Sequence, residues 1–197
     1  MNLPNKLTML RIILIPLFIG CFYLPESWVL FQLNGVGICL KYIIAGFMFL
    51  GAYITDMFDG RIARKRNLIT DFGKLMDPTA DKLLTASAMI MLTKFEVMSF
   101  GNLLMPVFTI IIIAREVFIS GIRQLAAGKG IIIAAKPIGK VKTTIQFAAI
   151  LTVLLLGQLC RAVGIPLDFG AICVAVVITV WSGIDYTIAS RELFRQR

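Results

Sequence analysis

The sequence predicts an all-α integral membrane protein whose chain crosses the bilayer as six transmembrane helices. The chain has 197 residues, 58% of them hydrophobic, and a mean hydropathy of +0.88, whereas a soluble domain is roughly half apolar. The apolar residues gather in runs of about 20, which is the length of a helix that spans a bilayer. The runs are continuous rather than alternating, and this favours spanning helices over the strands of a membrane barrel.

Six apolar runs follow one another along the chain, and each is expected to form one span. They are residues 7–24, 35–56, 71–93, 102–125, 138–159 and 167–189. The connections are short and carry no low-complexity stretch or repeat, so the sequence predicts one domain over residues 1–197. A short interfacial helix is expected at Asn5–Arg11, because Pro4 suits a first helical turn and Lys6 and Arg11 suit lipid headgroups.

The basic residues predict the orientation of the spans. Most of the 20 Lys and Arg residues fall on the side of the membrane that holds the N-terminus, and the other side holds Lys41, Lys94 and Arg161. Because basic segments stay in the cytoplasm, both termini are expected to be cytoplasmic. The net charge of +9 is therefore interpreted as a match to anionic membrane lipids and anionic substrates. We expect no nucleic-acid partner.

Histidine and cysteine narrow the possible chemistry. The chain has no His, which excludes His-based triads and His-ligated zinc and leaves carboxylates as the proton acceptors. The four cysteines lie scattered in apolar runs without a CxxC spacing. We therefore interpret them as small apolar packing residues.

Four carboxylates near the inner ends of the second and third spans are the strongest functional signal. Asp56 and Asp59 are three residues apart, and Asp77 and Asp81 are four apart, so each pair projects from one face of its helix. Carboxylate oxygens suit Mg²⁺ or Mn²⁺, and two such ions would clamp a pyrophosphate. The alternative is that these acids pair with neighbouring Arg and Lys for structure. Four ionised groups in so apolar a chain favour a functional site.

This spacing resembles the signature of the CDP-alcohol phosphatidyltransferase family. The signature reads D-x-x-D-G-x-x-A-R, then eight residues, then G-x-x-x-D-x-x-x-D. Its fixed positions are occupied by Asp56, Asp59, Gly60, Ala63, Arg64, Gly73, Asp77 and Asp81. The direct match covers 26 residues of the chain, and the six predicted spans also resemble the family's layout.

The resemblance implies a role for each residue of the motif. The four aspartates would ligate two Mg²⁺ or Mn²⁺ ions, and Asp81 would also be the general base that takes the proton of the acceptor alcohol. The CDP moiety would contact Gly60, Ala63, Arg64, Thr70 and Gly73. The resemblance also implies a homodimer.

Other segments resemble the bacterial branch of the family that makes phosphatidylglycerophosphate. These segments are residues 2–11, 114–116, 120–127, 136–143 and 181–186. The resemblance implies CDP-diacylglycerol as donor, sn-glycerol 3-phosphate as acceptor, CMP as the second product and a bacterial inner membrane with the site facing the cytoplasm. An inositol phosphate, serine or phosphatidylglycerol acceptor stays open.

Three basic residues are candidates for the phosphate of the acceptor. Arg115 is placed deep in the fourth span, and a buried cation at that depth needs an anionic partner. Arg115, Arg123 and Lys140 are therefore expected to form the acceptor-phosphate pocket. The alternative is that Arg115 pairs with Asp185 or Glu116 for structure, although the adjacent Glu116 points to a different helix face.

A non-enzymatic alternative is a divalent-cation carrier that uses the four aspartates as its permeation site. Carriers usually bind ions near the midplane, between repeats or broken helices. The four acids here lie toward one end of one helix pair, which favours a catalytic site that opens to the cytoplasm.

Overall fold

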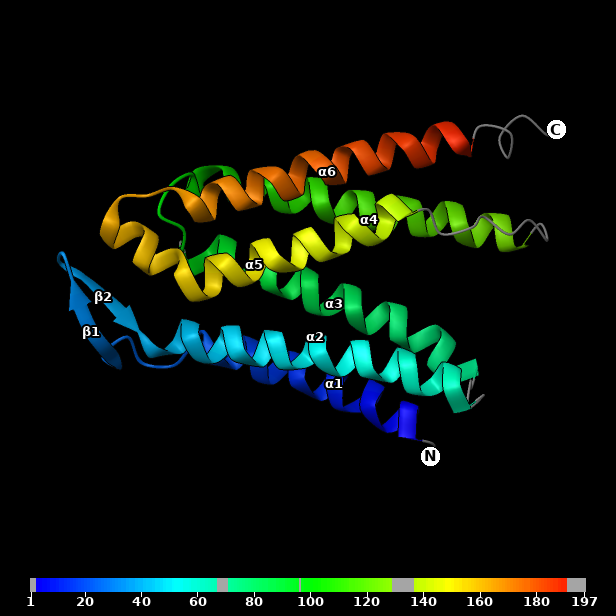
Figure 1. The fold of residues 1–197 in the computed structure, drawn as a ribbon, viewed down its shortest axis with the longest axis horizontal. Helices are drawn as coiled ribbons and strands as arrows, with labels where there is room; N and C mark the ends of the chain where they lie inside the picture. Colours follow the sequence, from blue (N-terminus) through cyan, green and yellow to red (C-terminus); the bar gives the residue numbers. More distant parts are fainter. Residues whose placement is uncertain (1–2, 67–70, 96, 129–136, 191–197) are drawn as a thin grey trace.

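The computed structural model describes residues 3–66, 71–95, 97–128 and 137–190, and for residues 3–8, 56–66, 71–78 and 137 it describes the backbone alone. Six α-helices dominate this part of the chain (Figure 1). The elements in chain order are α1 (Leu3–Cys21), β1 (Val29–Leu33), β2 (Val36–Cys39), α2 (Leu40–Arg66), α3 (Asp71–Phe95), the 3-10 helix η1 (Asn102–Leu104), α4 (Met105–Gly128), α5 (Pro137–Val163) and α6 (Leu167–Ala189).

The six helices pack as a closed ring of neighbours. Going around the ring, α1 contacts α2, α2 contacts α5, α5 contacts α6, α6 contacts α4, α4 contacts α3, and α3 returns to α1. Figure 1 shows that the end of α2 and the start of α3 lie at one end of the bundle, with the start of α1 and the end of α6. We call this the motif end, and the opposite end, which carries β1 and β2, the hairpin end.

The helices bear out an integral membrane protein. Three helical stretches are long and apolar enough to cross a bilayer, namely Asn102–Gly128, Ile138–Val163 and Leu167–Ala189. Two shorter apolar stretches, Met9–Cys21 and Leu40–Thr55, precede them. The count of six spans and the cytoplasmic side of the termini stay predictions. The short interfacial helix at the N-terminus also stays a prediction, and in the structure its residues belong to α1, one helix that contains Pro16.

The predicted start of the second span at residue 35 is wrong. Residues 29–39 instead form an antiparallel hairpin in which Leu33 pairs with Val36. Asn34 and Gly35, which join the strands, have φ angles of 49° and 80°. Asn-Gly is the pair that a tight hairpin turn prefers, because both central residues need positive φ. Helix α2 therefore begins at Leu40, and α1 ends at Cys21 rather than at residue 24.

A buried carboxylate fastens two connections together at the hairpin end. Asp168, in the first turn of α6, is fully buried. Its carboxylate accepts hydrogen bonds from the Ser99 backbone N–H at 2.6 Å, from the Ser99 hydroxyl and from the Phe169 N–H at 2.9 Å. These bonds tie the connection between α3 and α4 to the start of α6. A Cβ on the neighbouring Gly157 would lie 3.0 Å from the carbonyl oxygen of Val97, so the close approach of α5 favours glycine.

Candidate active site

The motif residues lie on two helix ends, and both of these ends belong to the motif end of the bundle. Asp56, Asp59, Gly60, Ala63 and Arg64 fall in the last turns of α2. Gly73, Asp77 and Asp81 fall in the first turns of α3, and Figure 1 shows both helix ends at the same end of the bundle. Thr70 lies outside the described residues, and of the four aspartates only Asp81 has a described side chain. The predicted ligand set and CDP contacts therefore stay predictions.

Asp81 lies half-buried on α3, beside an interior lined by α4 and α5. The next residue, Lys82, donates a hydrogen bond from its ammonium to the Ser120 hydroxyl of α4. Asp81 also interacts electrostatically with the ammonium group of Lys142 on α5. A cation on a helix far from Asp81 in sequence thus acts on the predicted base through its charge.

An ion pair joins α4 to α5 within this interior. The Lys142 ammonium is 2.5 Å from a Glu116 carboxylate oxygen, and the two side chains are only 2% and 15% exposed. Ser120 donates its hydroxyl to the Glu116 carbonyl oxygen at 2.6 Å. Glu116, Ser120 and Arg123 follow at the i, i+4 and i+7 positions of one helix face. This face of α4 is therefore polar from the bundle interior to the exposed Arg123.

Gln146 adds an unsatisfied polar group one helical turn from Lys142. Its side chain is 2% exposed. Neither the amide nitrogen nor the amide oxygen has a hydrogen-bond partner within the part of the chain that the structure describes. A buried amide without partners is costly, so this side chain marks a place where a polar ligand or water is favourable.

Arg115 points to a different neighbour from Glu116. Its guanidinium donates to the Ser182 hydroxyl of α6 at 2.6 Å and lies 5.7 Å from the centre of the Tyr186 ring. A Cβ on Gly183 would approach the Arg115 side chain to 3.2 Å, so glycine makes room for the arginine. Glu116 pairs with Lys142 instead of Arg115. The prediction that Arg115 and Glu116 point from different faces of their helix is therefore confirmed.

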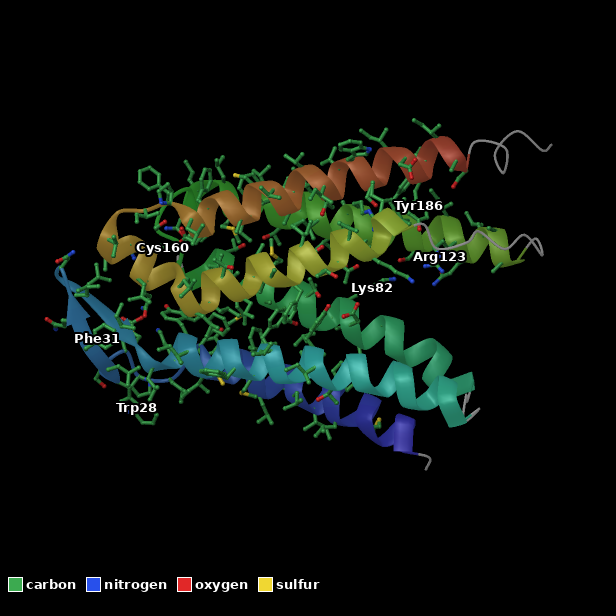
Figure 2. All side chains as sticks on the ribbon, in the orientation of Figure 1. Trp28, Phe31, Lys82, Arg123, Cys160 and Tyr186 are labelled. Carbon is green, nitrogen blue, oxygen red and sulfur yellow. The ribbon has the colours of Figure 1, made fainter. Side chains whose placement is uncertain are left out.

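The three predicted acceptor residues are only partly brought together. Arg115 faces Tyr186, and the same Tyr186 hydroxyl would lie 3.4 Å from a Cβ on Gly139, the neighbour of Lys140. Arg123 belongs to the other face of α4. Figure 2 labels Lys82, Arg123 and Tyr186 on the half of the bundle toward the motif end. Arg123 and Lys140 are exposed.

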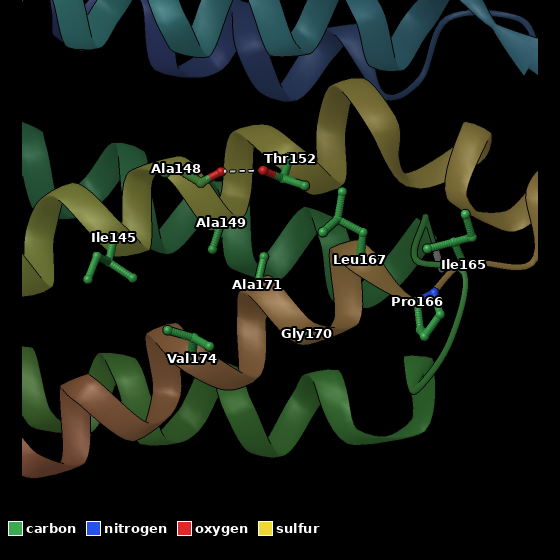
Figure 3. A pocket seen from close by; sticks show the side chains of 10 residues that line it. All are labelled: Ile145, Ala148, Ala149, Thr152, Ile165, Pro166, Leu167, Gly170, Ala171 and Val174. Atoms are coloured by element: carbon green, nitrogen blue, oxygen red, sulfur yellow. Dashed lines mark hydrogen bonds between the residues drawn. The ribbon is translucent and has the colours of Figure 1, made fainter.

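Two grooves on the bundle surface do not add a second candidate centre. One, of about 630 Å³, lies between α5 and α6 and is lined by apolar or small side chains and Thr152, whose hydroxyl donates to the Ala148 carbonyl oxygen (Figure 3). The other, of about 560 Å³, lies between α4 and α6, where Arg115 is its charged lining residue. The polar contacts between helices instead join α3 to α4 through Lys82 and Ser120, and α4 to α5 through Glu116 and Lys142.

Comparison with known proteins decides the family. The sequence model of the CDP-alcohol phosphatidyltransferase family matches residues 1–181. This chain belongs to the CDP-alcohol phosphatidyltransferase family.

Two bacterial relatives are similar to nearly the whole chain. The relative from Bacillus subtilis (strain 168) is 40% identical over 186 residues, which is 94% of this chain and 93% of the relative. The relative from Escherichia coli (strain K12) is 40% identical over 193 residues, or 96% of this chain and 95% of the relative. Both carry the name CDP-diacylglycerol–glycerol-3-phosphate 3-phosphatidyltransferase.

Sequence reasoning missed several polar side chains that join α3, α4 and α5. No role in the site is predicted from the sequence for Lys82, Ser120 or Lys142, and Glu116 is considered only as a structural partner of Arg115. A weak signal was available, because a lysine inside an apolar span needs an anionic partner. The identity of that partner was hidden, because Glu116 lies on another helix.

Proposed function

We propose that this chain transfers the phosphatidyl group of CDP-diacylglycerol to sn-glycerol 3-phosphate, giving phosphatidylglycerophosphate and CMP in phospholipid biosynthesis. One observation carries the proposal. Relatives that bear the name of this reaction are 40% identical to the chain over 94–96% of its length. The half-buried Asp81, the polar interior around it and the helical membrane bundle agree with such an enzyme.

We propose that Asp56, Asp59, Asp77 and Asp81 hold two divalent ions, Mg²⁺ or Mn²⁺. The donor set fits, because carboxylate oxygens are the ligands these ions prefer. Its four members also lie on the last turns of α2 and the first turns of α3. When bound, the ions neutralise charge on the pyrophosphate of the substrate.

In the proposed mechanism, Asp81 accepts the proton of the acceptor hydroxyl. The hydroxyl oxygen attacks the phosphorus atom that bears the diacylglycerol, and the bond from this phosphorus to the bridging oxygen of CMP breaks. CMP leaves with that oxygen. The Asp81 carboxylate suits the proton transfer because it is half-buried and because the chain has no His that could take the proton instead.

The CDP moiety is proposed to lie along the end of α2 and the start of α3. The proposed contacts are Gly60, Ala63, Arg64, Thr70 and Gly73. Glycine at two of these positions lets a nucleotide approach the backbone. An arginine suits a phosphate because its guanidinium donates two parallel hydrogen bonds.

Arg115, Arg123 and Lys140 are proposed to bind the phosphate of the acceptor. Arg115 supports this role, because its Nε has no hydrogen-bond partner among the described residues and a deep cation favours an anion. Arg115→Ala is expected to raise the KM for glycerol 3-phosphate and to change kcat much less. The matched control is Arg161→Ala at the hairpin end, and an unchanged KM in Arg115→Ala would remove this residue from the pocket.

The remaining proposals concern the setting of the enzyme. The motif end is proposed to face the cytoplasm from a bacterial inner membrane, because basic residues concentrate there. Labelling of cysteines with a membrane-impermeant reagent, compared between intact and permeabilised cells, tests this orientation. A homodimer is proposed from the resemblance to the family, and light scattering of the purified protein tests it.

The experiment that tests the function is CMP release by purified protein in detergent. CDP-diacylglycerol is supplied with a panel of acceptors, with Mg²⁺ or Mn²⁺ and with a chelator. Release that needs both the metal and glycerol 3-phosphate is expected. Release with inositol phosphate, serine or phosphatidylglycerol instead would overturn the acceptor. Folded protein that releases no CMP with any acceptor would favour the cation-carrier alternative.

A further inference from the structure

The hairpin carries an exposed apolar surface that the proposed reaction does not use. Trp28, Leu30 and Phe31, which we call the hairpin patch, are 50%, 54% and 51% exposed. Figure 2 labels Trp28 and Phe31 at the far end of the bundle from Lys82 and Arg123. Clustered large apolar side chains on a surface usually mark an interaction site.

The hairpin is held in a defined place on the bundle. The Asn34 side chain donates to the Ala162 carbonyl oxygen of α5 at 3.0 Å, and the Cys39 N–H donates to the Gln158 side chain at 2.7 Å. Both partners lie in the last turns of α5. The depth of the hairpin in a membrane is therefore tied to the end of a spanning helix.

A belt of cations and aromatic rings marks the same level of the bundle. Lys41 is buried, pairs with the exposed Glu26 at 2.8 Å and lies 5.2 Å from the Phe95 ring centre. Lys94 donates to the Tyr23 hydroxyl at 2.9 Å. Lysine and aromatic side chains with polar tips concentrate where a bilayer meets water, because their stems stay apolar while their tips reach the headgroups.

Two features of the backbone decide how far the hairpin enters the membrane and what covers it. The described sheet has two strands, so β1 has an unpaired edge, and unpaired N–H and C=O groups are not tolerated in the hydrocarbon core. The register of β1 shifts between Val29 and Phe31. Such a bulge hinders edge-to-edge pairing with another strand, which argues against a second copy of this chain on this edge.

We propose that the hairpin patch inserts into the boundary between headgroups and acyl chains of the leaflet at the hairpin end. Headgroups and water would satisfy the edge of β1, while Trp28, Leu30 and Phe31 reach the first part of the acyl chains. The partner is thus a phospholipid surface. The patch fixes the depth of the enzyme from the end opposite its chemistry.

Depth-dependent fluorescence quenching tests this proposal in liposomes. The chain has two Trp residues, so Trp181→Phe leaves Trp28 as the reporter. Brominated phospholipids are expected to quench Trp28 most strongly when the bromines lie high on the acyl chain, in keeping with burial of about 5–10 Å into the interface. Trp28→Phe leaves Trp181, which is 65% exposed on α6, and gives a reference on a spanning helix.

A pair of charge variants on the same strand sharpens the test. In the Trp181→Phe background, Phe31→Asp is expected to weaken quenching by brominated lipid and to shift Trp28 emission to longer wavelength. Gln32→Glu adds the same charge on the exposed β1 without removing an apolar side chain. It is expected to change neither the quenching by brominated lipid nor the emission wavelength of Trp28. CMP release by both variants checks that they are folded, since the motif lies at the other end.

Three outcomes would overturn the proposal. Strong quenching by iodide on both sides of the membrane, with none by brominated lipid, would place the patch in water. Strongest quenching by bromines at the chain ends would place it in the hydrocarbon core. Quenching by brominated lipid that disappears as dimers form at high protein density would make a second copy the occupant.

Discussion

Breaking the Glu116–Lys142 ion pair is expected to destabilise the protein strongly. The two groups are 2.5 Å apart, and Lys142 is only 2% exposed, so Glu116→Gln leaves a buried ammonium without its counter-charge. Removing one partner of a buried pair costs about 3–5 kcal/mol. We expect the lower end, about 3 kcal/mol, because Asp81 also attracts this ammonium. For a chain of this size, that loss corresponds to a fall in Tm of about 6–12 °C.

The double variant separates stability from catalysis. Glu116→Gln with Lys142→Met removes both charges and replaces the ammonium with an apolar side chain of similar length, so Tm is expected to return to near the wild-type value. If Lys142 serves only structure, CMP release returns as well. If its charge supports Asp81, Tm recovers but kcat stays low.

The assay is thermal unfolding in detergent, followed together with CMP release at a temperature where every variant is folded. A control is Gln32→Glu on the exposed strand β1, which adds a carboxylate outside this interior. A Tm of Glu116→Gln within experimental error of wild type would refute the reasoning, because it would mean that the ammonium finds another counter-charge or water at no cost.

Three further predictions concern other carboxylates. Asp81→Asn is expected to abolish CMP release while lowering Tm by much less than Glu116→Gln does, and activity near the wild-type level would contradict its role as base. Asp168→Asn weakens the acceptor of the Ser99 N–H and hydroxyl and is expected to lower stability by about 1–3 kcal/mol, measured as Tm, with the activity of the folded fraction retained. The hydrogen bond from Lys41 lowers the pKa of Glu26 below its ordinary value of 4.5. Stabilisation from this pair is therefore fully present above pH 4.5 and is lost as the pH falls through the lowered pKa. Glu26→Gln should remove the fall in Tm that this loss causes at acidic pH.

The motif and the helices were predictable because their signals are local. The four aspartates are recognised by their spacing alone, and apolar runs of about 20 residues indicate spanning helices without any knowledge of packing. Helix α6 shows this well, since the predicted span of residues 167–189 matches Leu167–Ala189. These signals need only the chain's own order and the period of the helix.

The hairpin was missed although its signal was also local. Averaged hydropathy cannot distinguish β2, with its Val36 and Ile38, from the first turn of an apolar helix. The pair Asn34-Gly35 carried the information, since it is the preferred sequence for a two-residue hairpin turn. A turn signal inside an apolar run should therefore outweigh the run itself.

The surroundings of Asp81 could not be predicted, because they depend on which helices are neighbours. Consecutive residues on a helix differ in direction by about 100°, so Arg115 and Glu116 must face different spaces. Which space each one enters depends on the position of α4 in the ring, between α3 and α6. That position sends Arg115 to Ser182 and Glu116 to Lys142. One helix thus directs a cation toward α6 and an anion toward α5, and this division follows from the place of α4 in the ring rather than from any local pattern in the sequence.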